Sequence, residues 1–276
     1  MISIFLRSLV FNVLFYVTMA IWIVAALPTF LMPRAVLVRM AKAWGRWNIW
    51  LMRVICGTRV KILGTGRIPK GPLIFASKHQ STWETFALFS LIDQPVFILK
   101  RELTWIPFFG WYLMKTGMIG IDRKAGLRSL KMLVRMTREQ VRLGRQLVIF
   151  PEGTRRPIGA PPAYKSGVAM IYAEGDVPCV PVALNSGLFW PRRTFLRYPG
   201  TITVEFLDPL PQGLRRDEFM SRLTASIEGA TASLVEAGRR EQARLSGRVR
   251  DAGPAGVRAF SSEVETGSRE ENASKQ

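Results

Sequence analysis

Hydrophobic and polar positions follow three different patterns along this chain, and each pattern predicts a different kind of structure. Residues 8–32 carry no charged side chain, and about 20 apolar residues are enough for a helix that crosses a bilayer. Residues 35–56 mix apolar and basic positions, which is typical of an amphipathic helix. Between residues 58 and 244, short β-rich runs alternate with helical patterns.

The first run predicts a membrane anchor. A secretory signal peptide is the alternative, but its apolar region is normally about 7–15 residues long and follows a basic stretch. Here only Arg7 precedes the run. Cations follow it, and the positive-inside rule then places the rest of the chain in the cytoplasm, on the inner membrane if the protein is bacterial. These cations are Arg34, Arg39, Lys42, Arg46 and Arg53.

The second run predicts a helix at the membrane surface. Trp44, Trp47 and Trp50 recur every three residues, and Lys42, Arg46 and Arg53 are interleaved in the same run. Tryptophan beside Lys or Arg suits the headgroup region. The alternative is a helix that packs on the core through its tryptophans. Residues 1–57 are therefore expected to form the anchor, with a transmembrane helix at about 8–32 and an interfacial helix at about 35–56.

The third pattern predicts an α/β fold with a mixed sheet covered by helices. Helices are expected at 85–91, at 127–144, and around a helical repeat that begins at Phe219. The residues after 244 are rich in Gly, Ser, Ala and Glu without periodicity, so 245–276 is expected to be a disordered tail. The expected strands are 60–63, 73–76, 96–99, 147–150, 180–184 and 201–207.

Composition adds a strong positive charge to this picture. The chain has 39 Lys and Arg against 20 Asp and Glu, a net charge of +19. The tail is balanced, so the whole excess lies in residues 1–244. A basic body implies an anionic partner, which can be nucleic acid, an anionic membrane surface or a phosphorylated substrate. One histidine and two distant cysteines, Cys56 and Cys179, argue against a zinc site or a disulfide framework.

The single histidine, His79, is the one imidazole that could do acid–base chemistry. Histidine has an unperturbed pKa of about 6.5, which lets it accept and return a proton near neutral pH. Glu84, five residues later, could fix the tautomer of the ring. There is a structural alternative for this carboxylate, because Ser81-x-x-Glu84 also fits a helix capping box.

Three more segments carry candidate chemistry. Residues 117–123 end in Asp122-Arg123, a pair that could also be a plain surface ion pair. Residues 150–156 read Phe-Pro-Glu-Gly-Thr-Arg-Arg after an expected strand. Ligands bind at strand ends in α/β sheets, and arginine can hold a phosphate through two parallel hydrogen bonds. Residues 180–184 are apolar and by themselves indicate a buried strand.

Together these four segments, in this order over about residues 60–210, resemble the glycerolipid acyltransferase superfamily. The resemblance is closest to the 1-acyl-sn-glycerol-3-phosphate acyltransferases. That family has a histidine followed after four residues by aspartate, a glycine followed by an aspartate–arginine or similar pair, a Phe-Pro-Glu-Gly-Thr run followed by arginine, and an apolar block with a central proline. Glu84 stands where the family has aspartate, which keeps the charge but changes the geometry.

The resemblance implies that residues 58–244 form an acyltransferase catalytic domain at a membrane. It would move an acyl group from acyl-CoA or acyl-carrier protein to the free sn-2 hydroxyl of lysophosphatidate, giving phosphatidic acid in phospholipid biosynthesis. His79 would be the general base and Glu84 would orient it, with no metal, bound cofactor or nucleic acid. The implied substrate-binding residues are Lys100, Arg123, Glu152, Gly153, Thr154 and Arg155.

Two alternatives stay open at this point. One is an acyltransferase that acts on another lysolipid acceptor. The other is a membrane-anchored protein that binds nucleic acid or anionic lipid, which the net charge and the basic and aromatic residues of 190–198 would favour.

Overall fold

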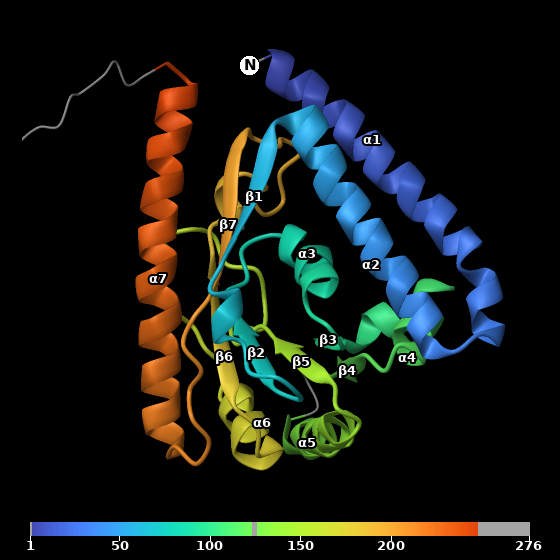
Figure 1. Cartoon of the computed structure of the whole chain (residues 1–276), viewed down its shortest axis with the longest axis vertical. Helices are drawn as coiled ribbons and strands as arrows, with labels where there is room; N and C mark the ends of the chain where they lie inside the picture. Colours follow the sequence, from blue (N-terminus) through green and yellow to red (C-terminus); the bar gives the residue numbers. More distant parts are fainter. Residues whose placement is uncertain (1, 123–125, 248–276) are drawn as a thin grey trace, which may run out of the picture.

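This computed structural model describes residues 2–122 and 126–247. Within them, seven strands form one sheet in the order β1-β7-β6-β2-β5-β3-β4, with helices on both of its faces (Figure 1). The expected mixed sheet is confirmed, because β6 and β7 are antiparallel while β2, for example, pairs in parallel with β5 and β6. The strands are β1 (Thr58–Leu63), β2 (Ile74–Ser77), β3 (Pro95–Lys100), β4 (Ile119–Ile121), β5 (Gln146–Ile149), β6 (Cys179–Leu184) and β7 (Gly200–Phe206).

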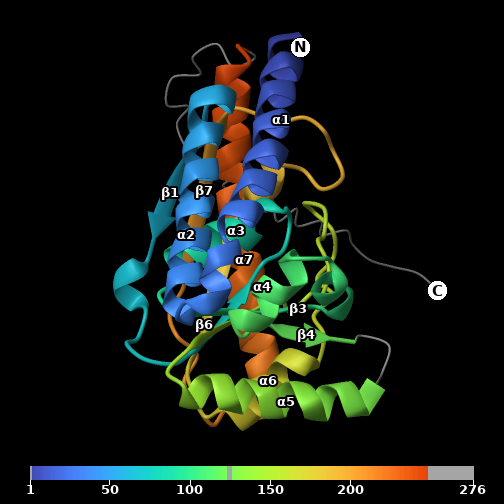
Figure 2. The same ribbon diagram turned by 90° about the vertical axis from the view of Figure 1, so that its right-hand side faces the viewer.

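The helices form two layers, one on each face of this sheet (Figure 2). The longer ones are α1 (Ile2–Ala25), α2 (Arg34–Leu51), α3 (Trp83–Leu91), α4 (Phe109–Lys115), α5 (Gly126–Arg142), α6 (Gly167–Gly175) and α7 (Arg216–Leu245). Short helical segments connect them, namely η1 (Leu27–Leu31), η2 (Met52–Cys56), η3 (Thr65–Arg67), η4 (Arg101–Trp105) and η5 (Ser186–Leu188).

The central strands β2, β5 and β6 bury both of their faces. Phe75 of β2 and the preceding Leu73 belong to a core cluster with residues of α1 and α3, whereas Ile74 and Ala76 belong to a cluster with residues of α5, α6 and α7. Successive side chains of a strand point to opposite faces. A strand covered on both sides therefore appears as a continuous apolar run. The six expected strands are confirmed, including β1, which lies at the edge of the sheet and is largely exposed.

Helix α1 is docked on the domain along one side. Phe11 and Phe15 are buried against the ring of Trp190, at centroid distances of 5.4 and 5.5 Å. Beside them, the backbone N–H of Arg197 donates to Ser8 Oγ at 2.8 Å, and its guanidinium donates to Asn12 Oδ1 at 2.9 Å. The other side of α1 is apolar and exposed, through Ile2, Phe5, Leu6, Leu9, Val10, Val13, Tyr16, Val17, Ile21 and Val24.

The sequence left open whether the tryptophans of α2 lie at a membrane surface or pack on the core, and the structure shows some of each. Trp44 packs against Phe15 and Phe86 in the core. Trp47 and Trp50 are exposed, and their rings lie 4.9 Å apart. The expected helix is present as α2 followed by η2, with only part of its aromatic surface available to a membrane.

The ends of the chain differ in how far the structure describes them. The helical repeat that begins at Phe219 belongs to α7, which continues to Leu245. The expected disordered tail falls almost wholly on residues 248–276, which lie outside the described residues, as does Arg123.

Candidate active site

His79 lies in the loop between β2 and α3, with Glu84 in the first turn of that helix. The ring atom Nδ1 is 3.2 Å from Glu84 Oε1. A carboxylate can only accept, so Nδ1 carries the hydrogen and donates it. Nε2 is then left with a free lone pair, on a ring that is 13% exposed while Glu84 is fully buried. This is the tautomer that a general base requires.

The Glu84 carboxylate has a second task. Its Oε1 also accepts the backbone N–H groups of Gln80 and Ser81 at 2.5 and 2.7 Å, and Oε2 accepts the hydroxyl of Ser186 at 2.9 Å. Four donors compensate for removing the charge from water. The two interpretations of Glu84 are therefore compatible, because one carboxylate contacts the histidine and holds the start of α3.

The loop between β5 and α6 holds His79 from three sides. Glu152 Oε2 accepts its backbone N–H at 3.1 Å, and the backbone N–H of Arg156 donates to its carbonyl oxygen at 2.7 Å. The ring of Phe150 stacks on the imidazole with a centroid distance of 3.9 Å. Both peptide groups and the ring plane of the histidine are thus fixed by residues 150–156.

Behind the histidine lies a buried cluster of charges. Lys78 Nζ donates to Glu152 Oε1 at 2.8 Å and to Glu228 Oε1 at 2.7 Å, and Tyr164 donates its hydroxyl to the same Glu228 oxygen at 2.8 Å. Burial and the neighbouring Glu228 raise the pKa of Tyr164, which keeps it a donor. The cluster connects the residue before His79 to α7.

The register of the sheet brings a third strand to this edge. Val148 of β5 pairs with Phe75 of β2 and with Phe97 of β3. Four residues further, just past the ends of these three parallel strands, come His79, Glu152 and Arg101. Neighbouring strands are about 4.8 Å apart, so the end of β3 lies roughly 10 Å from the end of β2, at the edge of the sheet where His79 follows.

The residues expected to bind substrate have different surroundings. The guanidinium of Arg155 donates to the hydroxyl of Thr82, just before α3. Thr154 is exposed and Gly153 adopts a φ of 65°, a value that favours glycine. Lys100 pairs with Glu102 at 2.9 Å. Glu152 differs from the expectation, because both of its oxygens are already occupied by Lys78 and His79.

Asp122 pairs with Arg101 of η4 at 2.7 Å, across the ends of β4 and β3. The described part of the chain therefore gives Asp122 a partner on a neighbouring strand. The role expected for Arg123 stays a prediction.

The cysteines do not belong to this site. Both are buried, and desolvation raises the pKa of the Cys56 thiol to about 12 and also raises that of Cys179. A thiol with a raised pKa is a poor nucleophile. Among residues 2–122 and 126–247, no group of three His, Cys, Asp or Glu side chains is placed to hold a metal ion.

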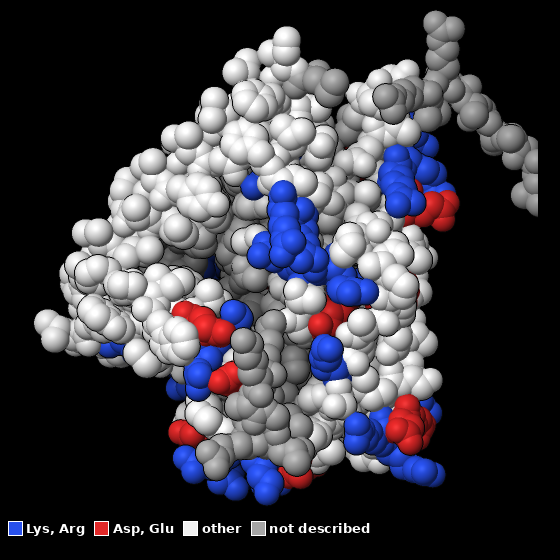
Figure 3. Space-filling view, turned by 180° about the vertical axis from the view of Figure 1, so that it is seen from behind, with Lys and Arg blue, Asp and Glu red and all other residues white. Residues whose placement is uncertain are grey.

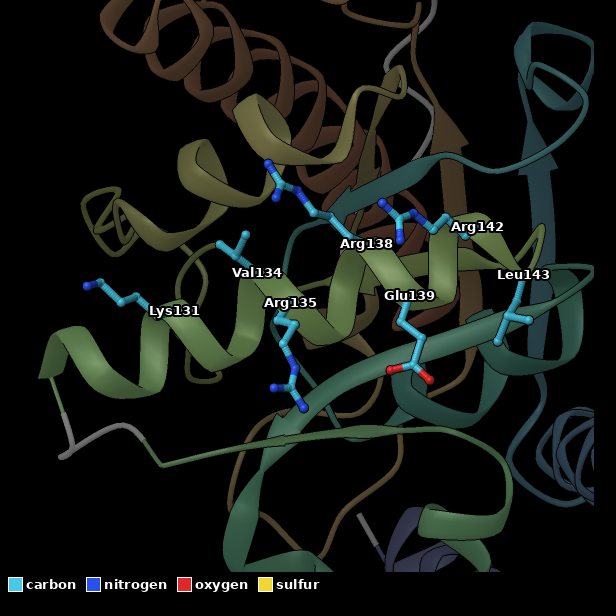
Figure 4. A pocket seen from close by; sticks show the side chains of 7 residues that line it. All are labelled: Lys131, Val134, Arg135, Arg138, Glu139, Arg142 and Leu143. Atoms are coloured by element: carbon cyan, nitrogen blue, oxygen red, sulfur yellow. The ribbon is translucent and has the colours of Figure 1, made fainter.

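A separate cavity of about 520 Å³ runs along the exposed side of α5 (Figure 4). None of the expected site residues lines it, and its position alone gives it no part in the chemistry. It is basic, and is lined by Lys131, Val134, Arg135, Arg138, Glu139, Arg142 and Leu143.

Sequence reasoning missed several members of this site. Ser186 follows the apolar strand β6, and a polar residue at a strand end is a signal that could have indicated it. Lys78 was visible beside His79, but its partner Glu228, and Tyr164, which donates to Glu228, carry no local signal. Phe150 was part of the third segment, while its stacking on the imidazole depends on the sheet order.

Comparisons with known proteins find acyltransferases. The family model described as acyltransferase matches residues 59–185. A 1-acyl-sn-glycerol-3-phosphate acyltransferase of Pseudomonas aeruginosa is 42% identical over 161 residues, which cover 58% of this chain and 63% of the relative. One from Cocos nucifera is 29% identical, covering 60% and 53%. The matched part thus spans less than two thirds of the length of these relatives.

The fold itself has a solved counterpart. The crystal structure of the 1-acyl-sn-glycerophosphate (LPA) acyltransferase PlsC from Thermotoga maritima matches with a TM-score of 0.69 and 22% identity, over 83% of this chain and 97% of that chain. The likeness covers a larger share of the chain than the family model does. Residues 59–185 thus match the acyltransferase family model, and the matched relatives are 1-acyl-sn-glycerol-3-phosphate acyltransferases.

Proposed function

We propose that this protein acylates the free sn-2 hydroxyl of 1-acyl-glycerol 3-phosphate, using a thioester as donor, and so makes phosphatidic acid. The observation that carries the proposal is the His79–Glu84 pair, which leaves Nε2 as a proton acceptor at the edge of the sheet. The names of the matched relatives supply the acceptor.

The proposed reaction needs no nucleophile from the protein. His79 Nε2 takes the proton of the acceptor hydroxyl while the hydroxyl oxygen attacks the thioester carbonyl. The tetrahedral intermediate then breaks its C–S bond, and the thiol leaves with the proton held by the imidazolium. Glu84 stabilises that imidazolium and keeps the ring in line. The donor would be acyl-CoA or acyl-carrier protein.

The phosphate of the acceptor would be held by cations around His79. Arg155 lies two positions after the turn at Gly153, and its bond to Thr82 places the guanidinium over the loop that carries His79. Lys100 and Arg123 are the other candidates from the sequence. Glu152 would act on the pocket indirectly, by holding His79 and Lys78.

A membrane location is part of the proposal. Residues 2–31 are long and apolar enough to cross a bilayer by length and composition. The region over α1 is nearly free of charged side chains, while Lys and Arg gather around the hollow in the middle of the view (Figure 3). We propose that the exposed side of α1 enters the hydrocarbon and that the flanking cations keep the domain on the cytoplasmic face. That α1 crosses the whole bilayer stays a prediction.

The test is a thiol-release assay in vesicles with lysophosphatidate and each donor type. His79→Ala should abolish turnover while α1 still binds the membrane and the fold persists. Turnover close to wild type would overturn the role of His79. Activity restricted to another lysolipid would support the alternative acceptor. A salt-sensitive complex with nucleic acid and no acyl transfer would support the binding-protein alternative.

A further inference from the structure

The connection between β3 and β4 exposes an unusual amount of apolar surface. Residues 101–118 form η4 and α4, and within them six large apolar side chains are 38–64% exposed. Contiguous exposed apolar patches on a protein mark sites of interaction. The six side chains, which we call the η4–α4 surface, are Leu103, Trp105, Ile106, Phe108, Trp111 and Met114.

This surface is continuous with the exposed side of α1. The ring of Phe30, just after α1, lies 6.3 Å from Trp111 and stacks on Tyr112 at 4.9 Å. The hydroxyl of Tyr112 donates to the carbonyl of Ile23 at 2.6 Å. Next to these contacts Leu31 is 95% exposed. Helix α4 is thus fastened to the end of α1, and their exposed apolar side chains adjoin.

The surface has the chemical character of a membrane interface. The Arg101 guanidinium lies 5.4 Å from the ring centre of Trp105, and Lys115 Nζ lies 5.9 Å from that of Phe30. Aromatic rings paired with cations are typical of the headgroup region, where one end of each pair is apolar and the other is charged.

A strained turn keeps part of this surface outward. Phe108 has φ 60° and ψ −55°, and the N–H of Phe109 donates to the carbonyl of Pro107 at 2.6 Å. This is the rare, strained form of γ-turn, and it leaves Phe108 exposed beside Trp111, with their ring centres 5.1 Å apart. Backbone strain of this kind persists only where the surrounding structure enforces it, and such positions cluster at functional sites.

The same connection starts at the edge of the sheet that carries the active site. Arg101, the first residue of η4, lies two strands from His79 by the register of β2, β5 and β3. A lysolipid that enters at η4 would therefore pass directly from lipid to the catalytic edge.

We propose that the η4–α4 surface inserts into the same leaflet as α1 and forms the entrance through which lysolipid leaves the membrane for the site. The partner of the η4–α4 surface in this proposal is the interfacial region of an anionic bilayer. The entrance role rests on the proposed function, whereas the insertion does not depend on it.

The insertion is tested with two matched probes on the full chain. Met114 on α4 is 58% exposed, and Met132 on α5, which packs on the other face of the sheet, is 57% exposed. Met114→Cys and Met132→Cys are each labelled with an environment-sensitive fluorophore, since Cys56 and Cys179 are buried and shielded from the label. The labelled proteins are mixed with vesicles of phosphatidylethanolamine and phosphatidylglycerol, with and without quenchers on the acyl chains.

The expected result is a blue shift and quenching at position 114 and neither at position 132. A probe at 114 that stays water-like, in the presence of vesicles, overturns the proposal. So does an equal response of both probes. A shift at 114 that depends on protein concentration without vesicles would indicate a second copy of the chain and also overturn it.

The entrance role is tested by kinetics. The double variant Trp105→Gln, Trp111→Gln should raise KM about tenfold for long-chain lysophosphatidate in vesicles and leave KM for a short-chain, monomeric lysophosphatidate unchanged. A tenfold effect corresponds to about 1.4 kcal/mol. Equal effects on both acceptors, or none on either, would overturn the entrance. Loss of the proposed function would appear differently, as no acyl transfer by the wild-type protein to either acceptor.

Discussion

Replacing Glu84 by glutamine separates the two tasks of this carboxylate. Four donors converge on it, from the His79 ring, from two backbone N–H groups and from the Ser186 hydroxyl. Three of these donors meet at Oε1, so the amide oxygen of glutamine should take that position and its amide nitrogen should face Ser186, whose hydroxyl oxygen can accept. Glutamine then still accepts the hydrogen of Nδ1 but carries no negative charge to stabilise the imidazolium.

The two effects have different sizes. A hydrogen bond to a charged group contributes about 1.5–3 kcal/mol and a neutral one about 0.5–1.5 kcal/mol, so the free energy of unfolding should fall by about 2 kcal/mol. Loss of the charge that stabilises the imidazolium weakens proton transfer by His79, and acid–base catalysis of this kind contributes about 10²–10⁴-fold. We therefore expect a loss of kcat on the order of 10²–10⁴ for Glu84→Gln.

The assay is thiol release with lysophosphatidate, run beside thermal unfolding of the same preparations. Ser186→Ala is the matched control, because it removes one donor to Glu84 without touching the ring. It should cost about 1 kcal/mol of stability and leave kcat within about tenfold. Glu84→Asp keeps the charge and should retain most activity. If Glu84→Gln loses stability but keeps kcat within tenfold of wild type, the carboxylate only caps α3 and the reasoning is refuted.

Three further predictions concern the surroundings of the site. Arg155→Ala should raise KM for lysophosphatidate about 10–100-fold with little change in KM for the donor. Arg135→Ala on α5 is the charge-matched control. Equal effects of the two variants on KM for lysophosphatidate would contradict a phosphate role for Arg155. Glu228→Gln should cost about 1–2 kcal/mol and lower kcat severalfold without changing either KM, and unchanged kcat would deny it a positioning role. Gly45→Ala should destabilise, because its Cβ would lie 2.0 Å from Ser90 Oγ and 2.9 Å from a backbone oxygen, whereas Gly229→Ala, with open space around it, should stabilise by about 0.5–1 kcal/mol. Thermal unfolding of the two glycine variants checks the opposite signs.

The central strands β2, β5 and β6 were predictable because both of their faces are covered. A strand buried on both sides cannot show alternation, so its apolar run stands out between polar loops. The elements that escaped prediction are short. β4 has three residues with a central glycine, and α6 has nine residues, too few and too uniformly apolar to show a helical period.

The site was predictable only where its residues are neighbours in sequence. His79 and Glu84 are five positions apart and therefore readable as a pair. Ser186 lies 102 positions from Glu84, and Glu228 lies 150 positions from Lys78. Their meeting depends on the sheet order, which places β6 beside β2 and packs α7 over β6. No local pattern encodes that order.

Helix α7 contributes Glu228 to the charge cluster and therefore limits how far this protein can be shortened. An expression fragment cut at residues 59–185 would omit β7 and α7. It would leave β6 as a bare edge strand, which invites aggregation, and would expose the apolar partners of Phe219, Leu223 and Ile227. It would also leave Lys78 without one of its two carboxylates. The smallest piece worth producing for structural or inhibitor work therefore extends through Leu245.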